Sequence, residues 1–165
     1  MTTIHTIIPS VVGDLQLVAG DGGLRGLHMA GQKYFVDPAV DSRPDPSAEL
    51  FVRAAEQLEA YFAGDLRAFD LPVEFVGTAV QVSIWEQLRL IPFGATTTYG
   101  ALAAAIGKPG MAQGVGQAVG HNPVCIVVPC HRVIGANGAL TGYAGGLERK
   151  RRLLELEGAL QPGLL

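Results

Sequence analysis

The sequence predicts two domains: an α/β domain over residues 1–76, with a small antiparallel sheet and one helix, and a mainly α domain over residues 77–165, with a helix-turn-helix. Two observations carry this prediction. Short apolar runs separated by turn signals fill the first part of the chain, which is typical of strands. From Thr78 onward the apolar residues recur at helical spacing instead.

The predicted sheet comes from three apolar runs over residues 4–8, 15–19 and 24–29. They are separated by Pro9 and by a glycine-rich turn at residues 20–23. Runs of this length, bounded by proline and glycine, predict strands joined as antiparallel neighbours.

A polar stretch with three prolines, over residues 37–46, predicts a loop. Asp45 followed by Pro46 predicts the start of a helix, because a capping residue precedes a proline of the first turn. The helix is expected to end at residues 64–65, after apolar residues at helical spacing: Phe51, Ala55, Leu58 and Phe62. The run over residues 71–76 fits another strand or a connector.

A first helix of the second domain is expected from Thr78 to the turn at residues 92–94, since it carries one apolar stripe: Val80, Ile84, Trp85, Leu88 and Ile91. Further along the chain, the apolar run over residues 124–128 predicts a strand. A last helix is expected over residues 147–157.

Between these elements lie two short helices. Thr98 predicts the cap of a helix over residues 99–106, and a second helix follows over residues 111–119. The turn that joins them, residues 107–110, contains two glycines. This pattern fits a helix-turn-helix, and it also fits a plain pair of core helices.

Composition limits the function classes. With 165 residues, 48% of them hydrophobic, the chain can bury a core, and no apolar run reaches the length of a membrane span. Two cysteines do not make a disulfide framework, so we expect a cytoplasmic protein. The net charge is −5 over residues 1–70, from ten Asp/Glu and five Lys/Arg, and +2 over residues 71–165, from five and seven. A nucleic-acid partner is therefore expected to contact the second half.

The string IVVPCHRVIG, residues 126–135, places a cysteine beside a histidine where a proline interrupts an apolar run. A thiol with its ordinary pKa of about 8.5 is only a few per cent thiolate at neutral pH, so a nucleophilic cysteine needs a base or a positive charge. His131 and Arg132 supply one of each. The pattern predicts a reactive thiol at Cys130.

Other interpretations of these residues stay open. Most cysteines are buried structural thiols. Cys125 competes with Cys130 for the reactive role, but its position in the apolar run places it on the opposite strand face and in the core. A metal site is disfavoured because the two cysteines and four histidines show no Cys-x-x-Cys or paired-histidine spacing.

His131 can act as the base through a water, and a carboxylate should then orient its imidazole. Three acidic residues lie downstream: Glu148, Glu155 and Glu157. Spacing alone also allows all three to be surface residues. The basic cluster at residues 149–152 fits a solvated helix face paired with neighbouring glutamates, and equally fits phosphate contacts.

Three segments closely resemble the O6-alkylguanine-DNA alkyltransferases: IPFGATTTYG at 91–100, GHNPVCIVVPCHRVIG at 120–135 and GALTGYAGG at 138–146. The resemblance extends over residues 77–158, and PCHRV with Asn122 eight residues before the cysteine is its most specific part. The first half resembles the family loosely. The resemblance implies an RNase H-like first domain and a winged-helix-like second domain.

The resemblance also implies an activity, the direct reversal of DNA damage. A methyl or other alkyl group would pass irreversibly from O6-alkylguanine, or O4-alkylthymine, to Cys130 after the nucleotide is flipped out of the duplex. The protein would act once, as a stoichiometric S-methyltransferase. Double-stranded DNA, bound through its minor groove by the helix-turn-helix, is the implied partner. A monomer is expected, and cooperative assembly on DNA stays open.

No metal or cofactor is implied. The zinc site of some relatives has no matching cysteines, because both cysteines of this chain lie in its second half.

Site residues follow from the same resemblance. It implies five catalytic residues: Cys130 as alkyl acceptor, His131 as the base acting through a water, Glu157 as its orienting partner, Asn122 as a hinge and Tyr99 as the donor to guanine. Four residues would line or flank the guanine pocket: Tyr143, Val133, Ala144 and Lys150. Three would face DNA: Gln113, Gly114 and Arg132. Backbone groups of Cys130 and Val133 would read the guanine amino group.

Two positions depart from the family pattern. Gln113 stands where the family has an arginine that fills the space of the flipped nucleotide, and glutamine lacks its charge and stacking plane. Gly114 beside it lowers helix propensity by about 1 kcal/mol relative to alanine. Weaker DNA binding or less efficient extrusion is therefore expected. Ala144 stands where some relatives have serine, so the backbone donor remains without the hydroxyl.

Three other functions would use some of the same residues. A lesion-binding sensor would lack the acceptor, so Cys130 argues against it, although Gln113 leaves room for a reduced repair role. A cysteine hydrolase using Cys130 and His131 would turn over repeatedly on an ester or amide. A transcriptional regulator needs base readout, which Gly114, Gly116 and the scarcity of long polar side chains disfavour.

Overall fold

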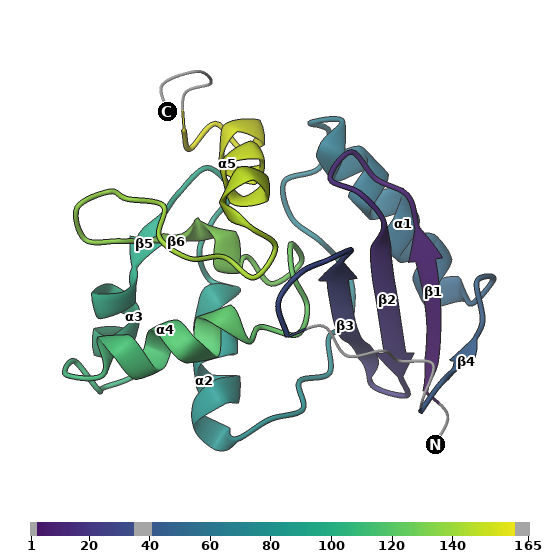
Figure 1. The fold of residues 1–165 in the computed structure, drawn as a ribbon. Helices are drawn as coiled ribbons and strands as arrows, with labels where there is room; N and C mark the ends of the chain where they lie inside the picture. The colour runs from purple at the N-terminus through teal and green to yellow at the C-terminus, as the bar shows by residue number, and fades with distance from the viewer. Residues whose placement is uncertain (1–2, 35–40, 161–165) are drawn as a thin grey trace. The chain divides into compact units, whose positions relative to one another are not determined.

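The computed structural model describes residues 3–34 and 41–160, and the chain divides into two compact units (Figure 1). The units consist of Met1–Val76 with Pro123–Cys125, and of Gly77–Asn122 with Ile126–Leu165. Among the described residues, no helix combines the length and apolar character needed to span a membrane. Each unit is built from elements that the sequence explains in large part.

The first unit is a four-stranded sheet with the order β3-β2-β1-β4. The predicted antiparallel pairing is confirmed for β1 (Ile4–Ile8), β2 (Leu15–Gly20) and β3 (Gly23–Met29). A short β4 (Arg43–Pro44) lies inside the predicted loop and pairs parallel with β1, so the sheet is mixed. Residues 37–40 of that loop lie outside the described residues.

Helix α1 (Glu49–Phe62) packs its apolar face into the core of this unit, with Phe51, Ala54, Leu58 and Tyr61 buried. The predicted helix start at Asp45 is wrong. The Asp45 amide donates instead to the His5 carbonyl at 2.9 Å, which continues the pairing of β4 with β1. The helix begins after this pairing ends, and its first residue follows Ala48, which provides no side-chain cap.

Two extended segments border β3. Val73 forms an isolated parallel bridge with Leu24, so residues 71–76 are a connector that touches the sheet rather than a full strand. Val124 forms a similar bridge with Leu27, flanked by hydrogen bonds from the Leu27 amide to the Pro123 carbonyl and from the Cys125 amide to the Leu27 carbonyl.

The predicted strand over residues 124–128 is wrong beyond Val124. The chain turns after Cys125, and Ile126 has a φ of 71°, which ends any extended run. Cys125, Ile126 and Val128 are all buried. The apolar composition that predicted a strand therefore reflects burial of a turn, which periodicity cannot distinguish from a short strand.

The second unit contains four α-helices among its described residues: α2 (Ala79–Leu88), α3 (Tyr99–Ala105), α4 (Ala112–Gly120) and α5 (Leu147–Leu156). All four lie within a few residues of the predicted ranges. They are accompanied by the 3₁₀ helix η2 (Cys130–Arg132) and by a two-stranded parallel sheet of β5 (Thr97–Thr98) and β6 (Val133–Ile134).

Local signals explain these helix starts. Thr78 and Gln81 form a capping box, with reciprocal side-chain bonds to each other's backbone amides at 3.1 and 3.0 Å. The predicted cap Thr98 is confirmed, because its hydroxyl accepts from the Ala101 amide at 3.1 Å. The residues of the predicted apolar stripe are buried except for Val80, which is 43% exposed.

Helices α2, α3 and α4 pack on one another, and α3 and α4 form the helix-turn-helix. The indole of Trp85 on α2 donates to the Ala118 carbonyl on α4 at 2.9 Å. This bond fixes α4 against the core of the unit. The mixed sheet with its helix and the helix-turn-helix together confirm the predicted fold class.

Candidate active site

Cys130 is the first residue of the 3₁₀ helix η2, directly after Pro129. Its amide donates to the Val128 carbonyl at 2.8 Å, and its side chain is buried, with the residue 4% exposed. A 3₁₀ helix has three residues per turn, so consecutive side chains point about 120° apart. Neighbouring Cys130 and His131 are therefore not forced to opposite sides, as they would be in a strand.

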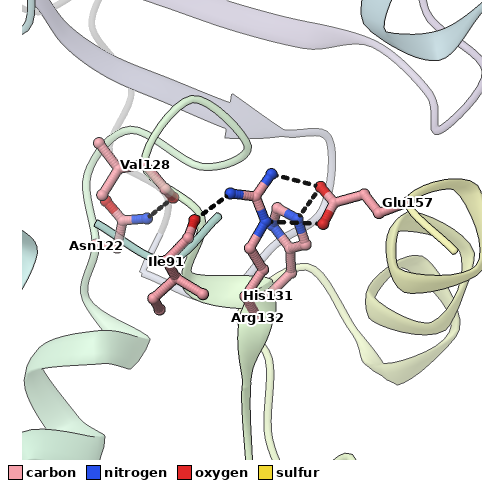
Figure 2. Close-up of polar contacts among 6 residues, drawn as sticks. All are labelled: Ile91, Asn122, Val128, His131, Arg132 and Glu157. Carbon is pink, nitrogen blue, oxygen red and sulfur yellow. Dashed lines mark hydrogen bonds and ion pairs between the residues drawn. The ribbon is translucent and has the colours of Figure 1, made fainter. Parts of the chain in front are cut away.

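His131 and Glu157 form a buried pair across the second unit (Figure 2). The imidazole Nε2 lies 2.7 Å from Glu157 Oε2, and both side chains are fully buried. A carboxylate only accepts, so Nε2 carries the proton and Nδ1 keeps its lone pair. Nδ1 is buried and makes no hydrogen bond with any residue that the structure describes. This nitrogen is placed to receive a proton.

Burial lowers the pKa of His131 below its ordinary value, an effect that the hydrogen bond and charge of Glu157 oppose. The positive charges of Arg132 and Lys150 lower this pKa further. The imidazole is therefore neutral at pH 7, which is the state that a base requires.

The structure shows which of the three downstream glutamates contacts His131, a question that sequence spacing leaves open. Glu157 follows the last residue of α5 and points to His131. Glu148 and Glu155 lie on the surface side of α5, each 3.7 Å from the Arg151 guanidinium.

Arg132 turns inward, at 6% exposure. Its Nε and Nη2 donate to the two carboxylate oxygens of Glu157 at 2.8 and 2.9 Å, and Nη1 donates to the Ile91 carbonyl at 2.6 Å (Figure 2). The guanidinium also lies 5.9 Å from the centre of the Phe93 ring. This placement favours a role in holding Glu157 over the expected contact with DNA.

Asn122 is also buried and follows the end of α4. Its Nδ2 donates to the Val128 carbonyl at 2.8 Å (Figure 2). The same oxygen accepts from the Cys130 amide. One carbonyl therefore ties the end of α4 to the turn that contains Cys130, a contact that suits the expected hinge.

Lys150 is fully buried, unlike the solvated face expected for residues 149–152. Its Nζ donates to the carbonyls of Val133 at 2.6 Å, of Gly142 at 3.3 Å and of Leu140. Burial lowers the pKa of Lys150 to about 8, and the negative charge of the Cys130 thiolate opposes that shift. Lys150 thus joins β6 to the glycine-rich loop and places a cation near the sulfur.

The residues expected at the guanine pocket lie on this loop and beside it. Tyr143 and Ala144 are half-buried, and Val133 is buried on β6. Tyr99, the first residue of α3, is half-buried, and its hydroxyl lies 3.0 Å from Thr141 Oγ1. No pattern in the sequence points to Thr141, because a threonine in a glycine-rich loop is an ordinary residue.

Gln113 and Gly114 occupy the first turn of α4 and are exposed. They are therefore accessible to a partner. A Cβ added at Gly114 would meet only the Met111 side chain, at 3.6 Å, so the backbone here needs no glycine for space. Among residues 3–34 and 41–160, no three His, Cys, Asp or Glu side chains gather as a metal site.

Two family models match the chain. The ribonuclease-like domain of 6-O-methylguanine DNA methyltransferase matches residues 3–75, and its DNA binding domain matches residues 79–159. The methylated-DNA–protein-cysteine methyltransferase of Mycobacterium tuberculosis is 49% identical over 159 residues, covering 96% of this chain and 94% of that protein. The protein of the same name from Methanosarcina acetivorans is 47% identical over 156 residues, covering 94% and 98%.

A solved structure agrees with these matches. The crystal structure of Mycobacterium tuberculosis OGT in complex with DNA has a TM-score of 0.85 and 48% identity, and it covers 96% of this chain and 94% of that chain. The matches span both units, and the resemblance read from the PCHRV segment is confirmed. This chain belongs to the 6-O-methylguanine DNA methyltransferase family.

Proposed function

We propose that the protein repairs DNA by taking the alkyl group of O6-alkylguanine onto the sulfur of Cys130. The observation that carries the proposal is the buried pair of His131 and Glu157 beside Cys130, with a neutral imidazole whose Nδ1 has no partner among the described residues. The membership of both units in one repair family supports it.

The first step is loss of the thiol proton. Nδ1 of His131 takes this proton from Cys130 through a water, while the proton on Nε2 stays on the side of Glu157. The carboxylate stabilises the imidazolium that forms, and the hydrogen bonds from Arg132 hold the carboxylate in place. The cation of Lys150 favours the thiolate.

The second step is an in-line displacement at the alkyl carbon. The sulfur–carbon bond forms as the carbon–O6 bond breaks, and the electron pair moves onto the guanine. A hydroxyl donor at the base, supplied by Tyr99, offsets this developing charge. The base takes one proton through this hydroxyl, which regains it from solvent, and His131 releases the thiol proton to solvent, so the base ends as ordinary guanine and the net number of protons is unchanged. The products are guanine in DNA and an S-alkylcysteine.

The target atom lies inside the base stack, so the nucleotide must leave the duplex before transfer. We assign the DNA contact to the exposed first turn of α4, where Gln113 and Gly114 lie. Structural similarity to a relative solved in complex with DNA supports this assignment.

The reaction ends with the alkylated protein, because a thioether offers no leaving group to water. One molecule therefore repairs one lesion. The acceptor has to be a reduced thiol, which favours a reducing compartment such as the cytoplasm.

The test counts lesions. Increasing amounts of protein are added to a fixed amount of duplex DNA with one O6-methylguanine, and the guanine restored is measured after the reaction stops. The proposal expects a plateau at one lesion per protein, none for Cys130→Ser and an unchanged plateau for the matched control Cys125→Ser. Restoration of several lesions per protein, or binding without restoration by the unaltered protein, would contradict it.

A further inference from the structure

Thr141 has an unusual backbone conformation for its side chain. It lies in the glycine-rich loop between β6 and α5, with a φ of 57°. A β-branched residue rarely adopts this left-handed conformation, for which glycine or asparagine is the ordinary choice. Such conformations persist where the surroundings fix them, and they concentrate at functional sites.

The surroundings fix Thr141 from both sides. The Lys150 ammonium donates to the carbonyls of Leu140 and Gly142, which are the residues directly before and after it. The Thr141 methyl group fills the space that a side chain at Gly135 would need, since a Cβ there would meet Thr141 Cγ2 at 2.9 Å. Backbone and methyl are thus both held, and the hydroxyl direction is determined.

The hydrogen bonds of the Thr141 hydroxyl show which residue donates in its contact with Tyr99. Thr141 Oγ1 lies 2.6 Å from the Leu140 carbonyl, which can only accept, so the threonine proton is used there. Thr141 Oγ1 can therefore only accept from the Tyr99 hydroxyl 3.0 Å away. The phenol proton is directed at Thr141.

We infer that Thr141 is a positioning residue for Tyr99: it orients the phenol hydroxyl as a donor before the alkylated base arrives, and the acceptor atom of the base then replaces the threonine oxygen. The inference rests on the proposed function, in which Tyr99 donates to the leaving guanine. Lys150 contributes indirectly, because its ammonium group holds the loop on which Thr141 lies.

The test compares three substitutions in a Cys125→Ser background. Thr141→Val keeps the shape and removes the hydroxyl, Thr141→Gly removes the hydroxyl and suits the positive φ, and Thr141→Ser keeps the hydroxyl. Single-turnover rate constants are measured for methyl transfer from duplex O6-methylguanine and, separately, for alkylation of Cys130 by iodoacetamide, which needs no donor from Tyr99.

One hydrogen bond of ordinary strength predicts a loss of about three- to tenfold in the methyl-transfer rate for valine and glycine, and less than about twofold for serine. The iodoacetamide rate should stay unchanged in all three variants. In a Tyr99→Phe background, Thr141→Val should have no further effect, because the two residues act through one bond.

Several results would overturn the inference. These are a valine variant as fast as the parent, a serine variant as slow as valine, a parallel fall in the iodoacetamide rate, or a full effect of Thr141→Val without the Tyr99 hydroxyl. Failure of the proposed function is distinguishable, because the parent protein itself would then transfer no methyl group.

Discussion

Replacing Arg132 with methionine should destabilise the second unit strongly, because it leaves a carboxylate buried without its cation. The guanidinium makes two charge-assisted bonds to Glu157 at 2.8 and 2.9 Å and a third bond to the Ile91 carbonyl, all away from solvent. Removing one partner of a buried ion pair costs about 3–5 kcal/mol of unfolding free energy. For a chain of this size, about 2–4 °C per kcal/mol converts this loss to a fall in Tm of roughly 6–20 °C.

The assay is urea and thermal unfolding of Arg132→Met, Glu157→Gln and the double variant. Because the double variant buries no unpaired charge, it should be more stable than Arg132→Met alone. Arg151→Met is the matched control, since its two ion pairs are 3.7 Å long and lie at the surface, and it should change the unfolding free energy by less than about 1 kcal/mol. A loss below about 1 kcal/mol for Arg132→Met, or purely additive effects in the double variant, would refute the reasoning.

Three further predictions follow from the same contacts. Because the pKa of His131 is lowered in the folded protein, the transfer rate should be retained at pH 6.5 and fall only at lower pH. The unfolded chain protonates His131 at a higher pH than the folded chain does, so the unfolding free energy should also fall as the pH drops below 6.5. Urea unfolding at several pH values measures this fall. Asn122→Ala should lower the unfolding free energy by about 1–3 kcal/mol, because a buried bond to the Val128 carbonyl is lost, whereas Asn137→Ala in an exposed turn should change it far less. Gln113→Arg should tighten binding to duplex DNA and steepen its salt dependence by about one counterion, and an unchanged salt slope in a binding titration would contradict a DNA contact at this position.

The parts of the fold that sequence could predict are those decided by neighbouring residues. The caps at Thr78 and Thr98 and the helical spacing of apolar residues define the helices of the second unit, because each signal acts within one turn. The start of α1 could not be predicted in this way, since Asp45 is recruited by His5, forty residues earlier. An apolar run does not reveal whether it is buried as a strand or as a turn, so the predicted strand is wrong at Ile126, where the chain turns.

The candidate site shows the same division. Cys130 and His131 are adjacent in the chain, so their chemistry could be predicted from composition and spacing. Only the family resemblance singled out Glu157 as the carboxylate that orients His131, because the two residues lie 26 positions apart in the chain. The resemblance implies a DNA contact for Arg132, and nothing local in the sequence shows that its acceptors in the structure, Glu157 and the Ile91 carbonyl, lie 25 and 41 residues away.

The central claim is that Cys130 becomes permanently alkylated. Intact mass is measured after incubation with excess duplex DNA containing O6-methylguanine, and the modified residue is then located by peptide mapping. Replacing S–H by S–CH₃ adds one methylene, so a single gain of about 14 Da on the peptide with Cys130, and no further gain on longer incubation, is the predicted result. An unchanged mass with lesion binding retained, or a modification that maps to Cys125, would contradict the account.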